Sequence, residues 1–417
     1  MNEPIFIARQ DTLEQEILPA HWLAQYKLFG EESYTFQDKG IWKKLCMSSA
    51  AANDRDIHAE ALEEMLTTFS AEHTGKWMLL VYGMDAAALE GLATMAAIAA
   101  NGTAMGAIAD NALLMHAIAN SETAMQRIAN SQTAMQRVAN NRGAMDAIGR
   151  SRIARDAVQA SPYYNSYIKE NDMAIAKLVV GFANLESAGY SGMTAVAASA
   201  TAMTAVAASS VARNAISASP YYDEKIKEND MAIAKLVVGF ANLESAGYSG
   251  CAGMAADSTA MTAVAASSTA MTAVAASGVA LKAIAQAYKN TANMLQFLKA
   301  VNASDTLIKR IYTTLTNATA LFGASQLGAQ DGVESANSWA TTSAAPNAFL
   351  ACACGYYSSG GSSVNVTYNG TVIAQNKTGA KQPGSVTSTN VNAITMAPST
   401  FTENGDGWLA VQKFTAK

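Results

Sequence analysis

A ten-residue repeat fills the middle of this 417-residue chain and limits what it can fold into. Its consensus is Ser/Asn-x-Thr-Ala-Met-x-x-Ile/Val-Ala-Asn/Ser. A fixed period over many copies predicts a repeat architecture. The residues expected to form the core of the repeats are Met105, Ile108, Met115, Ile118, Met125, Ile128, Met135, Val138, Met203, Val206, Met261, Val264, Met271 and Val274.

The spacing within each repeat predicts a short helix. Methionine and Ile/Val three positions apart, with alanine one position later, lie on one helical face. Ten residues fall about 80° short of whole turns, so a continuous helix would swing its apolar stripe away from any partner. The Asn/Ser pairs favour caps and turns, and they supply a break in each repeat. A helix of about two turns is unstable alone. It must therefore stack on its neighbours as a solenoid, or on copies in other chains.

A longer duplication overlies the repeats. Lys169–Gly192 recurs without change as Lys227–Gly250, and Ser-Pro-Tyr-Tyr precedes both copies. We expect each copy to form one longer helix. In the first copy it should begin at Asn171 or Asp172, with aspartate as the cap, and end near Gly189, with glycine as the terminator.

The end of the chain carries strand signals. Asn369-Gly370 lies between alternating apolar residues and predicts a hairpin. Ala348–Cys354, Val391–Met396 and Trp408–Phe414 are further expected strands. Together they predict a small antiparallel β-sandwich.

The predicted fold is multidomain α + β, with an α-helical, solenoid-like body of decapeptide repeats and a C-terminal antiparallel β-sandwich. The head is mixed in character, and Trp77–Tyr82 suggests a strand there. The expected segments are an N-terminal anchor domain (1–90), a repeat array (91–160), the first long-helix module (161–192), repeats (193–218), the duplicated module (219–250), repeats (251–286), a helical neck (287–323), a Gly/Ser/Thr/Asn-rich linker (324–346) and the β-sandwich (347–417).

Motifs for catalysis are missing from the sequence. His58-Ala59-Glu60 has the form of the zinc-deaminase motif, but no Pro-Cys-x-x-Cys follows. Cys352-Ala353-Cys354 lacks the CxxC spacing of a redox or zinc site. There is no P-loop, no G-x-S-x-G and no dinucleotide fingerprint. We therefore expect no enzyme, no cofactor and no metal, although a pair of carboxylates able to hydrolyse glycosides would carry no motif.

Charge and hydropathy suggest where the chain works. Only 15% of the residues are charged and the net charge is −5, which predicts no nucleic-acid partner. The opening Met1–Asp11 lacks the pattern of a signal peptide. No apolar run reaches the roughly 18 residues that a spanning helix needs. We expect a chain made in the cytoplasm and not inserted into a membrane.

Three features together resemble bacteriophage tail-fibre and related virion structural proteins. They are the opening Ile7-Ala8-Arg9-Gln10-Asp11-Thr12-Leu13-Glu14, the Ala-Met-rich arrays with their Ser-Pro-Tyr-Tyr junctions, and the terminal β domain. The resemblance covers the layout of the whole chain. It implies an N-terminal anchor to other virion proteins, a spacer shaft, and a distal β domain that touches a glycan or protein on the host surface. It carries over no catalytic residues.

The leading hypothesis is thus a tail-fibre or tail-tip protein of the virion, assembled in the host cytoplasm and acting as a homo-oligomer, expected to be a trimer. The alternatives are a head-decoration, collar or baseplate protein, a bacterial surface adhesin and, third, a depolymerase. Loops rich in Gly, Ser, Asn and Thr can hydrogen-bond a receptor. The candidate receptor contacts in and beside them are Tyr356, Tyr357, Asn376, Lys377, Asn404 and Trp408.

Overall fold

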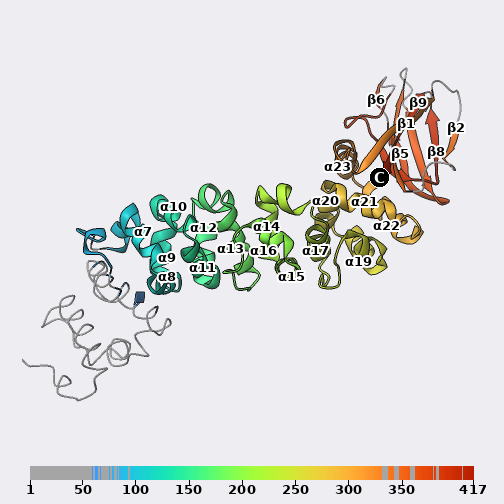
Figure 1. Cartoon of the computed structure of the whole chain (residues 1–417). Helices are drawn as coiled ribbons and strands as arrows, with labels where there is room; N and C mark the ends of the chain where they lie inside the picture. Colours follow the sequence, from blue (N-terminus) through green and yellow to red (C-terminus); the bar gives the residue numbers. More distant parts are fainter. Residues whose placement is uncertain are drawn as a thin grey trace, which may run out of the picture. The chain divides into compact units, whose positions relative to one another are not determined.

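The computed structural model is mixed in class, with a helical body followed by two small antiparallel sheets (Figure 1). It describes residues 84–92, 94–330, 337–341, 347–356, 362–378, 380–381, 385–405 and 407–417, with single residues between 59 and 82. The chain divides into two compact units, Met1–Val196 with Asn214–Pro220, and Ala197–Arg213 with Tyr221–Lys417. Most of the predicted head lies outside the described residues. Two described residues of the head, Met78 and Tyr82, are helical, so the strand expected over Trp77–Tyr82 is wrong.

Each decapeptide forms one helix, as its period predicts. The elements up to the first long helix are η4 (Ala86–Ala88), α6 (Met95–Ala100), α7 (Gly102–Asp110), α8 (Ala112–Ala119), α9 (Glu122–Ala129), α10 (Gln132–Ala139), α11 (Arg142–Arg150), α12 (Arg152–Ala160), the π-helix η5 (Asn165–Lys169) and α13 (Asp172–Phe182). The polar residue before each of α6 to α13, apart from η5, caps its helix by accepting a backbone N–H bond.

Within each unit, helices pack against the third element further along the chain. In the first unit α6 contacts α9, α7 contacts α10, α8 contacts α11 and α9 contacts α12. Helices α19 (Ser258–Ala266) and α20 (Ser268–Ala276) show how this arises, because they are bent by 103° across one polar residue. Three bends of this size bring the chain nearly through a full turn. The short helices thus obtain the apolar partner that they need to be stable.

The residue between two helices also bonds to the neighbouring turn of the chain. Ser151, between α11 and α12, accepts from Ala154 N at 3.3 Å and donates to the carbonyl oxygen of Ala119 at 2.6 Å. Ala119 ends α8, the helix against which α11 packs. The same bond joins Ser131 to Ala99 (2.6 Å), Ser161 to Ala129 (2.5 Å) and Asn171 to Ala139 (3.1 Å). The consensus Ser/Asn is therefore both a helix cap and a cross-link between stacked helices.

We expect Ser151→Ala to lower the free energy of unfolding by about 1–3 kcal/mol, because it removes a cap and leaves the buried Ala119 carbonyl unpaired. Ser166→Ala is the matched control, since Ser166 is exposed in η5. Urea denaturation of the full chain measures both changes. Equal effects would contradict the cross-linking role of Ser151.

The long helices are shorter than expected. α13 ends at Phe182 and not near Gly189, and its copy α17 (Asp230–Phe240) ends at the equivalent residue. Asn184 follows in the left-handed region with φ of 55°, and Leu185 N donates back to Val180 O at 3.1 Å. This is a Schellman ending with asparagine in the place usually taken by glycine. The Asn-Leu pair, and not the later glycine, stops the helix.

One glycine in each long helix permits close packing. A Cβ on Gly181 would collide with the carbonyl oxygen of Gly149 in α11. The equivalent Gly239 meets the carbonyl of Ala207 in the same way. These contacts explain how α13 lies directly against α11, and α17 against α15 (Ala200–Ala208).

The second unit continues the stacking and adds the neck. Besides α15, α17, α19 and α20 its elements include η6 (Tyr222–Ile226), α18 (Cys251–Ala256), α21 (Gly278–Gln286), α22 (Thr291–Asn302) and α23 (Asp305–Asn317), whereas α14 (Met193–Ala198) and α16 (Ser210–Ala218) cross the unit boundary. α22 and α23 are the two neck helices that the sequence predicts. α22 packs on α19 and α23 packs on α20, so the neck continues the third-neighbour rule.

Two sheets follow the neck. The strands are β1 (Phe322–Gln330), β2 (Asn337–Thr341), β3 (Ala348–Tyr356), β4 (Ser362–Tyr368), β5 (Thr371–Thr378), β6 (Ala380–Lys381), β7 (Ala393–Met396), β8 (Ser399–Gly405) and β9 (Gly407–Ala416). One sheet has the order β1-β9-β3-β6, with β7 also paired to β3, and the other has β2-β8-β4-β5. The predicted hairpin is confirmed, because Asn369 and Gly370 join β4 to β5 with φ of 46° and 73°.

The expected linker over 324–346 is wrong for the part that the structure describes. β1 runs through Gln330, and Asn337–Thr341 forms β2. β1 pairs with β9 from Phe322 to Gln330, and β2 pairs with β8. The small residues of this segment suggested a linker, but its backbone is paired along the edges of both sheets.

Candidate functional site

The predicted core residues of the repeats are all buried. Met105, Met115, Met125, Met135 and Met203 have no exposed surface, and Met261 and Met271 are 1% exposed. Their Ile/Val partners are equally buried. The methionines therefore pack inside the helical stack.

The predicted receptor contacts fall on both sheets. Tyr356 and Trp408 belong to β3 and β9 of one sheet, where Tyr356 pairs with Gly407 and Trp408 with Gly355. Asn376 and Lys377 lie on β5, and Asn404 lies on β8 of the other sheet. The side chains of Tyr356, Asn404 and Trp408, and all of Tyr357, are outside the described part.

Two of these residues have a structural partner. The backbone N–H of Asn376 donates to Asn365 Oδ1 at 2.7 Å, and Asn376 has a φ of 49°. The ammonium of Lys377 lies 3.0 Å from the Asp305 carboxylate at the start of α23. Lys377 thus links the sheet to the neck, while the Asn376 side chain faces solvent.

The neck and the sheets are joined by buried polar contacts. Asn302, at the end of α22, donates to Ile394 O at 2.7 Å and accepts from Ile394 N at 3.1 Å. Its side chain therefore pairs with β7 as a neighbouring strand would. The hydroxyl of Tyr312 lies 2.8 Å from Val386 O and 2.9 Å from Gln412 Oε1. These bonds fix both neck helices to the sheets.

The apolar core is continuous through this junction. Phe349 of β3 lies with its ring centroid 6.3 Å from that of Phe297 in α22 and 6.4 Å from that of Phe322. Tyr312 and Phe414 meet edge-on at 5.7 Å. The last repeats, the neck and both sheets share one cluster of buried residues. We call this region the neck junction.

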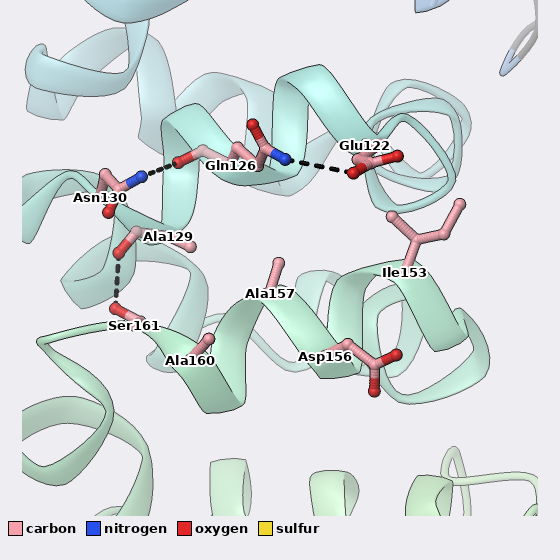
Figure 2. Close-up of a pocket in the computed structure, with 9 residues that line it drawn as sticks. All are labelled: Glu122, Gln126, Ala129, Asn130, Ile153, Asp156, Ala157, Ala160 and Ser161. Carbon is pink, nitrogen blue, oxygen red and sulfur yellow. Dashed lines mark hydrogen bonds between the residues drawn. The ribbon is translucent and has the colours of Figure 1, made fainter.

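The helical surface of the first unit carries a groove between α9 and α12 (Figure 2). Its volume is about 410 Å³. The lining residues are Glu122, Gln126, Ala129 and Asn130 from α9 and its end, and Ile153, Asp156, Ala157, Ala160 and Ser161 from α12 and its end. Figure 2 shows Glu122 near Ile153 at one end of the groove and Ser161 beside Ala129 at the other.

A second groove, of about 330 Å³, lies between α7 and α10. It is lined by Gly106, Ala109, Asp110, Gln136, Arg137, Asn140 and Asn141. Gly106 and Gln136 hold the position after methionine in their repeats, which Gln126 holds in the α9 repeat. The position that the repeat leaves variable thus lines grooves between stacked helices.

The two copies of the duplicated module each bury a lysine, but the ionic partner of that lysine is present only beside the first copy. The Lys177 ammonium is fully buried and lies 2.6 Å from the Asp146 carboxylate, and it donates to Ser187 O at 2.8 Å. Its copy Lys235 donates to Ser245 O at 3.0 Å, but the repeats before the second module have Thr204 at the position that Asp146 holds before the first. Burial lowers the pKa of Lys235, and the charge of Glu244 opposes this shift.

Among the described residues, no group of three or more His, Cys, Asp or Glu side chains could hold a metal ion. Burial raises the pKa of the Cys352 thiol, which disfavours a reactive thiolate. Within the same part of the chain no single helix is long and apolar enough to span a membrane, and α19 with α20 would pass only as a bent pair.

No protein-family model and no curated protein matches this sequence. The sequence analysis predicted neither the grooves nor the neck junction, but the sequence carries one signal for the groove between α9 and α12. Ile153 stands where the consensus has threonine, and it is 40% exposed.

Proposed function

We propose that this chain is a non-enzymatic structural protein that presents a C-terminal binding module on a stiff spacer. The observation that supports this most strongly is the neck junction. Only four residues separate α23 from β1, and one core runs from the repeats into the sheets. A module attached in this way moves with its support.

The spacer role follows from the packing of the repeats. Each helix packs against the third element further along the chain, so its contacts are local in sequence. Further repeats can therefore be added with the same packing. We propose on this basis that the body is a solenoid. The two sheets share buried residues such as Phe349 and Phe401, which supports a β-sandwich.

We further propose that the chain is a tail-fibre or tail-tip component of a bacteriophage virion. The N-terminal region would attach to other virion proteins, and the β module would bind a host surface glycan or protein as part of a trimer. Asn376 lies on β5, Asn404 on β8 and Trp408 on β9, and these three remain the receptor contacts that we propose. The sequence resemblance and the neck junction support this assignment.

Immunogold labelling tests it. Antibody raised against the full chain should label the tails of particles produced by the organism that encodes it. Excess purified chain should also compete with those particles for adsorption to cells. Label on heads or collars without competition would indicate a scaffold component instead. Label on the surface of cells, with none on particles, would indicate an adhesin.

A further inference from the structure

The buried lysine of the first module shares an anionic atom with a buried serine. Asp146 Oδ1 lies 2.6 Å from the Lys177 ammonium and accepts from the Ser187 hydroxyl at 2.9 Å. Lys177 and Ser187 have no exposed surface. We call these three residues the Lys177 site. A single oxygen atom there carries the negative charge between two buried donors.

The second module keeps both donors without the carboxylate. Lys235 is 2% exposed and Ser245 is 3% exposed. The Lys235 ammonium donates to Ser245 O at 3.0 Å and to Ala246 O at 3.2 Å. An ammonium has three N–H donors. In the part of the chain that the structure describes, neither the third N–H of Lys235 nor the Ser245 hydroxyl bonds to an acceptor. Leaving such buried donors unpaired is costly.

The helices around the two lysines are packed alike. Gly181 in α13 approaches Gly149 O, and Gly239 in α17 approaches Ala207 O in the same way. Each residue of the second pair follows its counterpart by 58 positions, as Thr204 follows Asp146 and Lys235 follows Lys177. Thr204 therefore takes the place of Asp146 beside Lys235. We call Thr204, Lys235 and Ser245 the Lys235 site.

The surface over the Lys235 site is also more open. Beside the first module, Arg142 and Arg150 bond to the loop that follows α13. Ala200 and Ala208 hold their positions beside the second module, and both are exposed. The two long side chains are thus replaced by methyl groups. A small ion from solvent can approach Lys235 from this side.

Glu244 is the acidic residue that acts on Lys235 within the chain. Its charge raises the pKa of Lys235 against the larger effect of burial, which lowers it. The Glu244 carboxylate is exposed and accepts from Ala246 N at 3.2 Å. Among the described residues no hydrogen bond or ion pair joins it to Lys235 or to the Ser245 hydroxyl. Glu244 therefore lessens the excess charge of the site without meeting its donors.

We propose that the Lys235 site binds a chloride ion between the Lys235 ammonium and the Ser245 hydroxyl, where the Lys177 site has Asp146 Oδ1. A monatomic anion suits this place because one oxygen atom fills the equivalent position. Threonine also has one heavy atom fewer than aspartate, which leaves room for an ion. A cationic donor and a neutral donor that converge on one point match a halide. This inference does not depend on a role in a virion.

Chloride-35 NMR of the full chain tests the proposal. At constant ionic strength, with gluconate replacing chloride, the protein should broaden the chloride resonance. The excess broadening should fall as the site saturates, with a dissociation constant on the order of tens of millimolar for so few contacts. Thr204→Asp should abolish the saturable part, because its own carboxylate takes the place of the ion. Asp146→Thr should about double it, because the Lys177 site then has the same unpaired donors.

Thr272→Asp is the matched control. Thr272 follows Met271 as Thr204 follows Met203, and it is exposed, so the same charge enters at the same repeat position away from Lys235. It should leave the broadening unchanged. Glu244→Gln should tighten chloride binding, because it removes a competing negative charge. Circular dichroism would show that each variant is folded, and the two aspartate variants decide the proposal if Asp146→Thr does not fold.

Three results would overturn the proposal. The first is the absence of saturable broadening in the unmodified chain, which would mean that water or Glu244 satisfies Lys235. The second is an equal effect of Thr204→Asp and Thr272→Asp, which would place the bound chloride elsewhere. The third is a folded Asp146→Thr variant that binds no additional chloride.

Discussion

Met135→Asp is expected to lower the free energy of unfolding by about 3–5 kcal/mol, because it places an unpaired carboxylate in an apolar stack. Met135 has no exposed surface and lies on the buried face of α10 beside Val138. The helices that pack on α10, α7 among them, bring their own buried methionines to this stack. No described lysine or arginine is buried with Met135.

The adjacent residue supplies the control. Gln136→Asp introduces the same carboxylate one position later, where the side chain is exposed, and should change stability by less than about 0.5 kcal/mol. Met135→Leu should cost under about 1.5 kcal/mol, since it keeps the volume and the apolar character. Urea denaturation of the full chain, followed by circular dichroism, compares the three. Similar losses for the two aspartate variants would mean that the helices face another way.

The sequence predicted the helices better than their partners. The ten-residue period placed a helix in each repeat and a cap at each Ser or Asn, because both depend on neighbouring residues alone. Stacking on the third element depends on the bend between helices. No single repeat encodes that bend in its apolar pattern. The bond from Ser151 to Ala119 spans 32 residues, and it could not be predicted without knowledge of that bend.

The sequence likewise predicted the strands that depend on local signals and missed those that depend on distant pairing. The hairpin at Asn369-Gly370 was predictable, since two residues with positive φ favour that turn. The strand β1, with the sequence Phe-Gly-Ala-Ser-Gln-Leu-Gly-Ala-Gln, has few strand formers, and its composition predicts a linker over most of its length. Its pairing with β9, which is distant in sequence, holds it in the sheet.

The candidate groove lay beyond sequence reasoning for a geometric reason. Glu122 and Ile153 are far apart in the chain and share a groove only because α12 stacks on α9. The exposed isoleucine in a threonine position was a visible anomaly, yet its counterpart across the groove was not. The duplicated module, by contrast, was fully visible, and it supplies a natural comparison of two buried lysines.

Lys177→Met should destabilise the chain by about 3 kcal/mol, because it leaves the Asp146 carboxylate without its cation. The Asp146 side chain is only 16% exposed, and among the described residues it would keep a single bond, from the Ser187 hydroxyl at 2.9 Å. Lys235→Met makes the same change in the second module. There Thr204 takes the position of Asp146, so no carboxylate loses its cation. It should cost about 1 kcal/mol, since two carbonyls lose a donor while a poorly solvated charge is removed.

A double variant separates the two causes. Lys177→Met with Asp146→Thr places Met and Thr at the two positions, the same pair that Lys235→Met forms with Thr204. It should recover about 2 kcal/mol of the loss caused by Lys177→Met alone, because no buried charge remains. Urea denaturation of the full chain measures all three variants. Equal losses for Lys177→Met and Lys235→Met, or no recovery in the double variant, would show that the shared carbonyl bonds and not Asp146 make Lys177 important.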